Sequence, residues 1–221
     1  IKDISLNIQA PLAALKKPKA LKQQSNGQLN FNIKNTILNL GVNPLQINSL
    51  EGTGKWSQGV FHPDIKGTAL GSQFGLKGDL PLTTTQKNIK ADINWTELDI
   101  TRLPLPKSES WHPESGNVSG AFNISGPLTE TGKALPKNLK GKLNFKLNKL
   151  VLAQPNPSEK ISLPTLEGNG DYQNNQLNYQ VIGNIFAGNF KSNGAVKDLK
   201  HPILDNQIEF TNLDLSKLKL L

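Results

Sequence analysis

The chain contains an internal duplication, and this constrains its fold more than any other feature of the sequence. The matching stretches are GQLNF at 27–31 and GKLNF at 141–145, LEGTG at 50–54 and LEGNG at 166–170, and INWTELDITRL at 93–103 and IEFTNLDLSKL at 208–218. Both copies keep glycines and alternating apolar positions, and neither keeps a reactive side chain. Such a duplication is typical of an extended scaffold built by repetition.

Apolar and polar residues alternate through both copies with the period of two that a half-buried strand requires. Leu29, Phe31 and Ile33 alternate with polar residues, and a similar run starts at Leu143. Helix signals are weak, because Pro18 interrupts the one basic segment that carries helical spacing. We expect a mainly β, antiparallel fold with roughly six or seven strands per half.

The domain organisation follows from the repeat. We expect a first β repeat over 1–106, a junction over 107–116 and a second β repeat over 117–221. The LEGxG stretches, Asn26-Gly27, 174–175 and 193–194 carry turn chemistry, so we predict short hairpin connections at these places.

Composition narrows the possible partners. Hydrophobic residues make up 36% of the chain and the mean hydropathy is −0.41, which suits a sheet with one apolar face. A net charge of +8 favours anionic surfaces. Lys16, Lys17, Lys19, Lys137 and Lys140 are expected in solvated loops, with attraction of lipid head groups as the alternative. No nucleic-acid partner is expected, because Arg102 is the one arginine and 6% aromatic residues form no stacking platform.

The sequence predicts that the chain is not an enzyme. His62, His112 and His201 each precede a proline and have no ligand spacing, so we interpret them as exposed turn residues. Asp99 is expected to accept backbone N–H bonds where a strand ends. Cysteine is absent, which excludes thiolate catalysis and disulfides. We therefore expect no catalytic residue, no metal site and no cofactor.

An amphipathic sheet must cover its apolar face or offer it to an apolar ligand. Two architectures satisfy this requirement. The first is a curved open sheet that forms a U-shaped apolar groove. The alternative is a pair of closed β-sandwiches, which would act as an adhesion or assembly module that binds protein or glycan.

The strand openings at Gly27 and Gly141, the LEGxG stretches, the run 179–194 with Phe186 and Phe190, and the closing 211–218 segment resemble the AsmA family of Gram-negative envelope proteins, which includes TamB-like lipid-transfer proteins. The resemblance implies a non-enzymatic periplasmic segment that holds phospholipid acyl chains in a hydrophobic groove, for transport between inner and outer membranes and envelope maintenance. It also implies inner-membrane anchorage through a segment not present in this chain. The residues expected to line the groove are Leu29, Phe31, Ile33, Phe74, Leu76, Leu143, Phe145, Leu147, Phe186 and Phe190.

Overall fold

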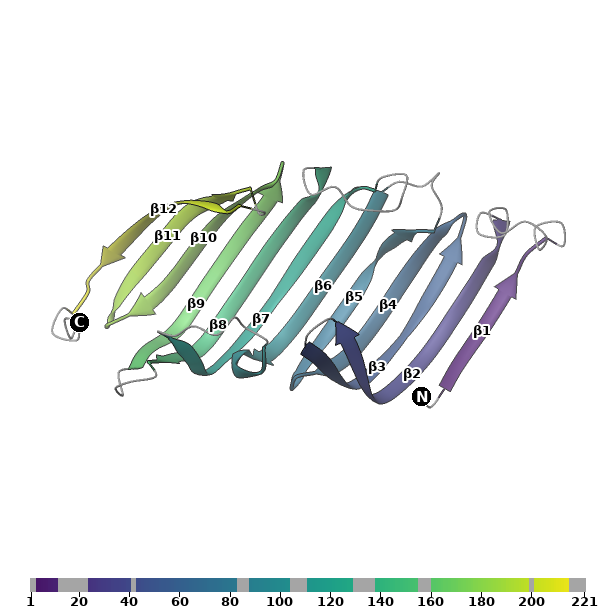
Figure 1. Ribbon diagram of the computed structural model, residues 1–221, viewed down its shortest axis with the longest axis horizontal. Coiled ribbons are helices and arrows are strands. Elements are labelled where there is room, and N and C mark those ends of the chain that lie inside the picture. Colours follow the sequence, from purple (N-terminus) through teal and green to yellow (C-terminus); the bar gives the residue numbers. More distant parts are fainter. Residues whose placement is uncertain are drawn as a thin grey trace.

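A computed structural model describes residues 3–11, 24–40, 43–82, 88–103, 111–128, 138–154, 160–198 and 201–214. These residues form one antiparallel twelve-stranded sheet in which every strand pairs with its neighbours in the sequence (Figure 1). The strands are β1 (Asp3–Gln9), β2 (Asn26–Leu40), β3 (Asn43–Ser57), β4 (Val60–Ala69), β5 (Ser72–Pro81), β6 (Asn88–Asp99), β7 (His112–Pro127), β8 (Lys140–Ala153), β9 (Lys160–Gln173), β10 (Gln176–Ile185), β11 (Gly188–Lys197) and β12 (Ile203–Thr211). A 3-10 turn, η1 (Ile100–Arg102), follows β6.

The curved open sheet expected from the alternating sequence is confirmed. Strand β1 forms one edge and strand β12 forms the other, so the sheet does not close on itself. The closed sandwich alternative is wrong, because a single layer of strands has no second sheet to pack against. No large side chain among the described residues is fully buried, as a sandwich core would require.

The duplication has a direct structural counterpart in strand order. Residues 27–31 lie in β2 and residues 141–145 lie in β8, six strands further along the sheet. Residues 50–54 and 166–170 occupy β3 and β9 in the same way. The first copy thus supplies β1 to β6 and the second supplies β7 to β12.

The sheet runs without interruption across the expected junction. Strand β6 pairs with β7 from Asn88↔Pro127 to Asp99↔Asn117. Residues 107–110 of the expected junction lie outside the described residues, and His112–Gly116 already belong to β7. The two repeats therefore share one continuous hydrogen-bonded surface.

Backbone conformation repeats along with the sequence. Left-handed residues occur at matching places in the two copies, as the pairs Asn35 and Lys149, Gln58 and Asn174, Leu70 and Phe186, and Glu97 and Asn212. Only the three asparagines among these eight residues are of a type that favours a positive φ, so residue type alone does not predict the set. The duplication has preserved the positions of the bends and turns as well as the strands.

The predicted hairpins at the LEGxG stretches are wrong. Gly52 and Gly54 lie inside β3, and Gly168 and Gly170 lie inside β9. Asn26-Gly27 and Asn193-Gly194 are also strand residues, whereas 174–175 form the predicted turn between β9 and β10. The mid-strand glycines have a packing role, which is described below.

The most buried apolar cluster lies where β8 and β9 approach their connection. Leu147, Leu150 and Leu163 are 6%, 7% and 8% exposed, and they pack against residues that include Ile185 and Phe190. Lys149 takes a positive φ just before Leu150, which bends the strand at this point. Figure 1 shows the ends of β2 and β3, and those of β8 and β9, curling away from the plane of the sheet.

Candidate functional site

One face of the sheet is apolar from edge to edge. Directly paired residues of antiparallel strands project to the same side, and side chains alternate along each strand, so the register assigns every side chain to a face. The apolar face is formed by Ile4, Leu6 and Ile8 of β1, Leu29, Phe31 and Ile33 of β2, Leu50 and Trp56 of β3, Phe61 and Ile65 of β4, Phe74 and Leu76 of β5, Ala91, Ile93 and Trp95 of β6, Val118, Phe122 and Ile124 of β7, Leu143, Phe145 and Leu147 of β8, Leu166 and Tyr172 of β9, Leu177, Tyr179 and Val181 of β10, Phe190 and Val196 of β11, and Leu204, Ile208 and Phe210 of β12.

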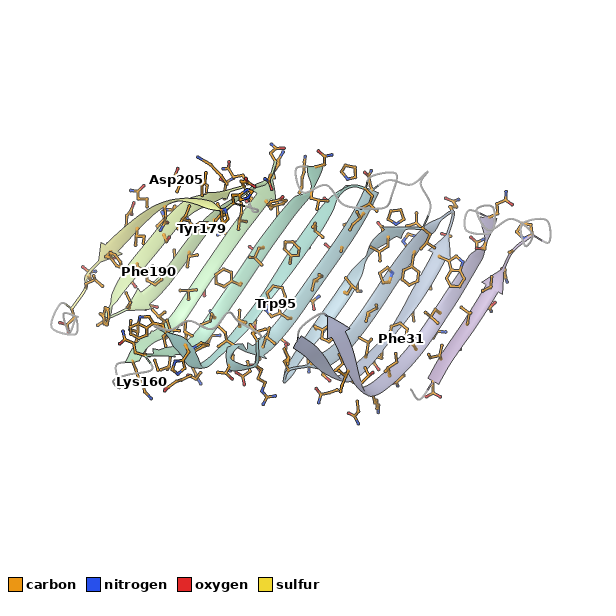
Figure 2. The ribbon with its side chains drawn as sticks, in the orientation of Figure 1. Phe31, Trp95, Lys160, Tyr179, Phe190 and Asp205 are labelled. Carbon is orange, nitrogen blue, oxygen red and sulfur yellow. The ribbon has the colours of Figure 1, made fainter. Side chains whose placement is uncertain are left out.

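The structure brings nine of the ten predicted groove residues onto this face. They come from β2, β5, β8 and β11, and Figure 2 labels Phe31 and Phe190 among them. Phe186 is the exception, because it forms the turn between β10 and β11 with a φ of 49°. The strand register therefore does not assign Phe186 to either face of the sheet.

Aromatic rings on the apolar face lie over glycines of the adjacent strand. A side chain added at Gly168 would collide with the Phe145 ring, and one added at Gly120 would collide with the Trp95 ring. The direct pairs in which the ring lies over the glycine are Trp56 and Gly27, Phe74 and Gly67, Trp95 and Gly120, Phe145 and Gly168, Phe190 and Gly183, and Tyr179 and Gly194.

This pairing has two consequences. A glycine inside a strand lacks a side chain to pack, and an aromatic ring from the neighbouring strand covers the exposed backbone. The ring in turn lies low over the sheet instead of standing upright from it. Aromatic rings thus lie flat along the apolar face, and the space above them is open.

The exposure of the face confirms that nothing in the described part of the chain covers it completely. At the edges, Leu6 is 60% exposed, Leu204 is 62% exposed and Phe210 is 54% exposed. Toward the middle, Ile93 is 36% exposed. Contiguous apolar area of this kind usually marks a place where a ligand or partner binds.

The curled tip of β8 and β9 encloses part of the face. Leu150 and Leu163 of this tip form a buried cluster with Leu147, and Ile185 of β10 and Phe190 of β11 pack against this cluster. The tip therefore bends over the apolar side of the sheet and forms one wall of the groove. We call the segment 150–163, of which 150–154 and 160–163 are described, the flap.

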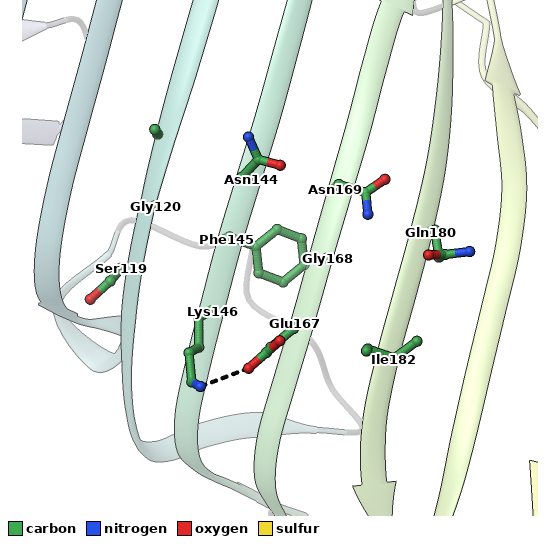
Figure 3. A pocket seen from close by; sticks show the side chains of 11 residues that line it. Ser119, Gly120, Asn144, Phe145, Lys146, Glu167, Gly168, Asn169, Gln180 and Ile182 are labelled. Atoms are coloured by element: carbon green, nitrogen blue, oxygen red, sulfur yellow. Dashed lines mark ion pairs between the residues drawn. The ribbon is translucent and has the colours of Figure 1, made fainter.

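The opposite face is polar. Ion pairs join neighbouring strands there, such as Lys77 Nζ to Asp64 Oδ2 at 3.2 Å and Lys146 Nζ to Glu167 Oε1 at 2.7 Å. A depression of about 550 Å³ opens on this face around the second ion pair (Figure 3). Its lining combines Asn144 and the charged pair with the exposed Ile182.

Histidines form no catalytic arrangement among the described residues. His62 lies within β4 and its Nδ1 is 2.7 Å from Asp79 Oδ1, and both side chains are about half exposed. His112 begins β7, so the predicted turn placement is wrong for His62 and His112 and is confirmed for His201, which lies in a bend. Within the described ranges, no three His, Cys, Asp or Glu side chains are grouped to hold a metal ion.

Asp99 has the structural role predicted for it at the end of β6. Its Oδ1 accepts hydrogen bonds from the Thr101 hydroxyl at 2.7 Å and the Thr101 backbone N–H at 3.0 Å, and Arg102 Nε lies 3.2 Å from its Oδ2. The Thr101 hydroxyl bond contributes most to lowering the pKa of Asp99 below its ordinary value of 3.8. This carboxylate caps η1 and fixes the chain as it leaves β6.

Two further expectations concern contact with membranes. Of the lysines predicted to lie in loops, Lys140 instead begins β8, and Lys16, Lys17, Lys19 and Lys137 lie outside the described residues. Within the described ranges, no helix has both the length and the apolar character needed to cross a bilayer.

The glycine–aromatic pairs and the flap are the parts of the site that sequence reasoning missed. Phe145 and Gly168 are directly paired across β8 and β9 but lie far apart in the chain, so a local pattern does not connect them.

Comparison of the chain with family models, with curated proteins and with solved structures found no match.

Proposed function

We propose that this chain is a non-enzymatic lipid-binding segment that holds acyl chains along its apolar face. The observation that carries the proposal is the largely apolar face that extends across all twelve strands and lies open on one side of a single-layer sheet. Within the part of the chain that is described, no side-chain cluster with catalytic geometry competes with this interpretation.

The dimensions of the face suit acyl chains. Twelve strands about 4.8 Å apart extend over roughly 50 Å. Half the hydrocarbon thickness of a bilayer is about 15 Å, which is the length available to one acyl chain in a membrane. The face has room for more than one lipid, with each polar head group remaining in water.

The free energy of removing apolar surface from water favours binding of an acyl chain that makes no specific polar contacts. Removing one methylene of an acyl chain from water contributes roughly 0.8 kcal/mol, and the low-lying rings of Phe74 and Phe145 offer a flat apolar floor. Binding energy would be distributed over many positions, which permits a lipid to shift along the groove without losing most of its contacts.

Substitution of one residue on each face tests the proposal. Native mass spectrometry and lipid extraction of the purified chain should detect bound phospholipid. Phe145→Asp, which places a charge on the apolar face, should reduce the lipid-bound fraction severalfold, because a carboxylate in contact with acyl chains loses its hydration.

Asn144→Asp is the matched control, since Asn144 precedes Phe145 in β8 and lies on the polar face. It introduces the same charge on the same strand and should leave lipid occupancy unchanged. Phe31→Asp and Asn32→Asp provide the same comparison in the first repeat. A folded Phe145→Asp variant that retains wild-type lipid occupancy would refute the proposal.

The wider biological context is part of the proposal. The sequence resemblance to the AsmA family and the open groove support a periplasmic segment that moves phospholipid between inner and outer membranes, with anchorage to the inner membrane elsewhere in the protein. The adhesion-module alternative depended on a closed sandwich, and the sheet is open. No observation on the described residues favours that alternative.

A further inference from the structure

The two edges of the sheet are complementary to each other. Strand β12 is the counterpart of β6 in the duplication, and β1 is the counterpart of β7. Strands β6 and β7 pair with each other inside the chain. The edge of β12 that faces away from β11 therefore corresponds to the edge of β6 that pairs with β7. Strand β1, as the counterpart of β7, has the sequence pattern of the strand that pairs at this edge.

Both edges are accessible in the described structure. Every residue of β1 and of β12 is exposed, and among the described strands each pairs with one neighbour, β1 with β2 and β12 with β11. An edge strand with unpaired backbone groups and apolar side chains is a template for pairing with another strand. We propose that β12 of one copy of this chain pairs with β1 of a second copy, antiparallel and in the register of the internal β6–β7 pairing.

The register follows from residues on the polar face of the internal pairing. Asp92 is directly opposite Asn123, and the Asn123 Nδ2 donates to Asp92 Oδ1 at 2.6 Å. The duplication maps Asp92 to Gln207 and Asn123 to Asn7. Between copies, the Asn7 amide would donate to the Gln207 side-chain carbonyl in the same way.

Residues on the apolar face agree with this register. Ile93 is directly opposite Phe122 in the internal pairing. Their counterparts are Ile208, which is 51% exposed, and Leu6, which is 60% exposed. Pairing would bury both side chains against each other and extend the apolar face across the two copies.

One hydrogen bond at the irregularity in the β6–β7 pairing also has a donor counterpart just after β12 and an acceptor counterpart on β1. The backbone N–H of Glu97, which has a positive φ, donates to Ser119 Oγ at 2.9 Å across the β6–β7 pairing. Asn212, the counterpart of Glu97, also has a positive φ, and the counterpart of Ser119 is Asp3. The Asp3 carboxylate would accept the Asn212 N–H between copies.

The charges on the two edges are compatible with this pairing. In the inferred register, Asp205 is opposite Gln9 and Glu209 is opposite Ser5, so no two acidic side chains face each other directly. Like charges placed directly opposite would oppose association. The interface joins different edges of the two copies, so it is heterologous and leaves a free edge at each end.

Engineered cysteines test the register, because the chain has no cysteine of its own. Purified Asn7→Cys and Gln207→Cys chains, carrying tags of different mass, are mixed and oxidised mildly. Directly opposed residues of antiparallel strands have Cα atoms about 4.5–5.5 Å apart, which suits a disulfide. The mixed dimer of these two variants should form at least about tenfold more than the dimer from Asn7→Cys mixed with Thr211→Cys, which lies about 13 Å out of register.

Two outcomes would overturn the inference. Dimers of one variant with itself as the main product would indicate a two-fold symmetric contact instead. Absence of mixed dimer, together with a sedimentation mass of one copy at every concentration of the wild-type chain, would show that the edges do not pair. Lipid occupancy is measured separately in the same samples, so failure of the pairing is distinguishable from failure of the proposed lipid binding.

Discussion

At the scale of single residues, the apolar face depends on glycines that have no turn function. A methyl group at Gly168 would occupy the position of the Phe145 ring and approach the Gln180 carbonyl oxygen at 3.2 Å. The neighbouring Gly170 is on the same strand and the same face, but a methyl group there first meets the Leu177 Cδ1 at 3.0 Å. Gly168 therefore leaves space for an aromatic ring, whereas Gly170 lies next to a movable leucine methyl. Because both glycines lie on the same strand and face, their substitutions can be compared directly.

We expect Gly168→Ala to destabilise the chain by about 1–3 kcal/mol, because the ring must leave its position over the strand. Gly170→Ala should cost less, since a leucine methyl can move aside. Urea unfolding monitored by circular dichroism measures both. Combining Gly168→Ala with Phe145→Leu should recover part of the loss, and equal effects of the two glycine substitutions would contradict the packing described for the ring.

Asp99 provides a prediction about pH. Its pKa is lowered in the folded chain, so the folded state binds its proton less readily than the unfolded state does. The stabilisation is present above the ordinary value of 3.8 and is lost as the pH falls through the lower folded pKa. Titration followed by NMR should place the Asp99 midpoint below 3.8.

Thr101→Val removes the hydroxyl that contributes most to this shift, so it should move the Asp99 midpoint upward. Thr96→Val, at an exposed threonine within β6, is the control and should leave the midpoint unchanged. An Asp99 midpoint that does not respond to Thr101→Val would show that the hydroxyl bond does not control this carboxylate.

At the scale of secondary-structure elements, the strands were predictable and their bends were not. Alternation in 29–33 and 143–147 predicted β2 and β8, and the duplication predicted the equivalent strands of the two halves. The LEGxG glycines were misinterpreted because the same residue types form turns, and only the opposite strand shows that Phe145 lies over Gly168. The flap was not predicted because Lys149 takes a positive φ that its residue type does not favour.

The flap gives a prediction about stability. Leu163→Ala removes an 8% exposed side chain from the cluster with Leu147 and Leu150, and we expect a loss of about 2–4 kcal/mol. Leu204→Ala, at a position 62% exposed on β12, should change stability by about 0.5 kcal/mol or less. Thermal and urea unfolding of both variants compare the two sites. Similar losses would mean that the flap does not pack on the sheet as described.

At the scale of the whole molecule, the described residues form a single sheet with one apolar face, one polar face, and β1 and β12 as its edge strands. The face groups nine of the ten residues predicted to line a groove. The tenth, Phe186, lies in a turn, because its apolar character alone does not distinguish a turn position from a strand position. Duplication of a six-stranded unit lengthens the apolar face without adding a core. An extended face of this kind is consistent with the proposed binding of long acyl chains.

The most direct test of lipid binding on the apolar face is photocross-linking with a phospholipid that carries a diazirine on its acyl chain, followed by mass-spectrometric mapping of the modified residues. We expect adducts on the apolar face, at positions such as Phe31, Phe74 and Phe145, and few on the polar face around Lys146 and Glu167. Adducts spread equally over both faces, or confined to the polar face, would contradict the claim that the open apolar face holds the lipid.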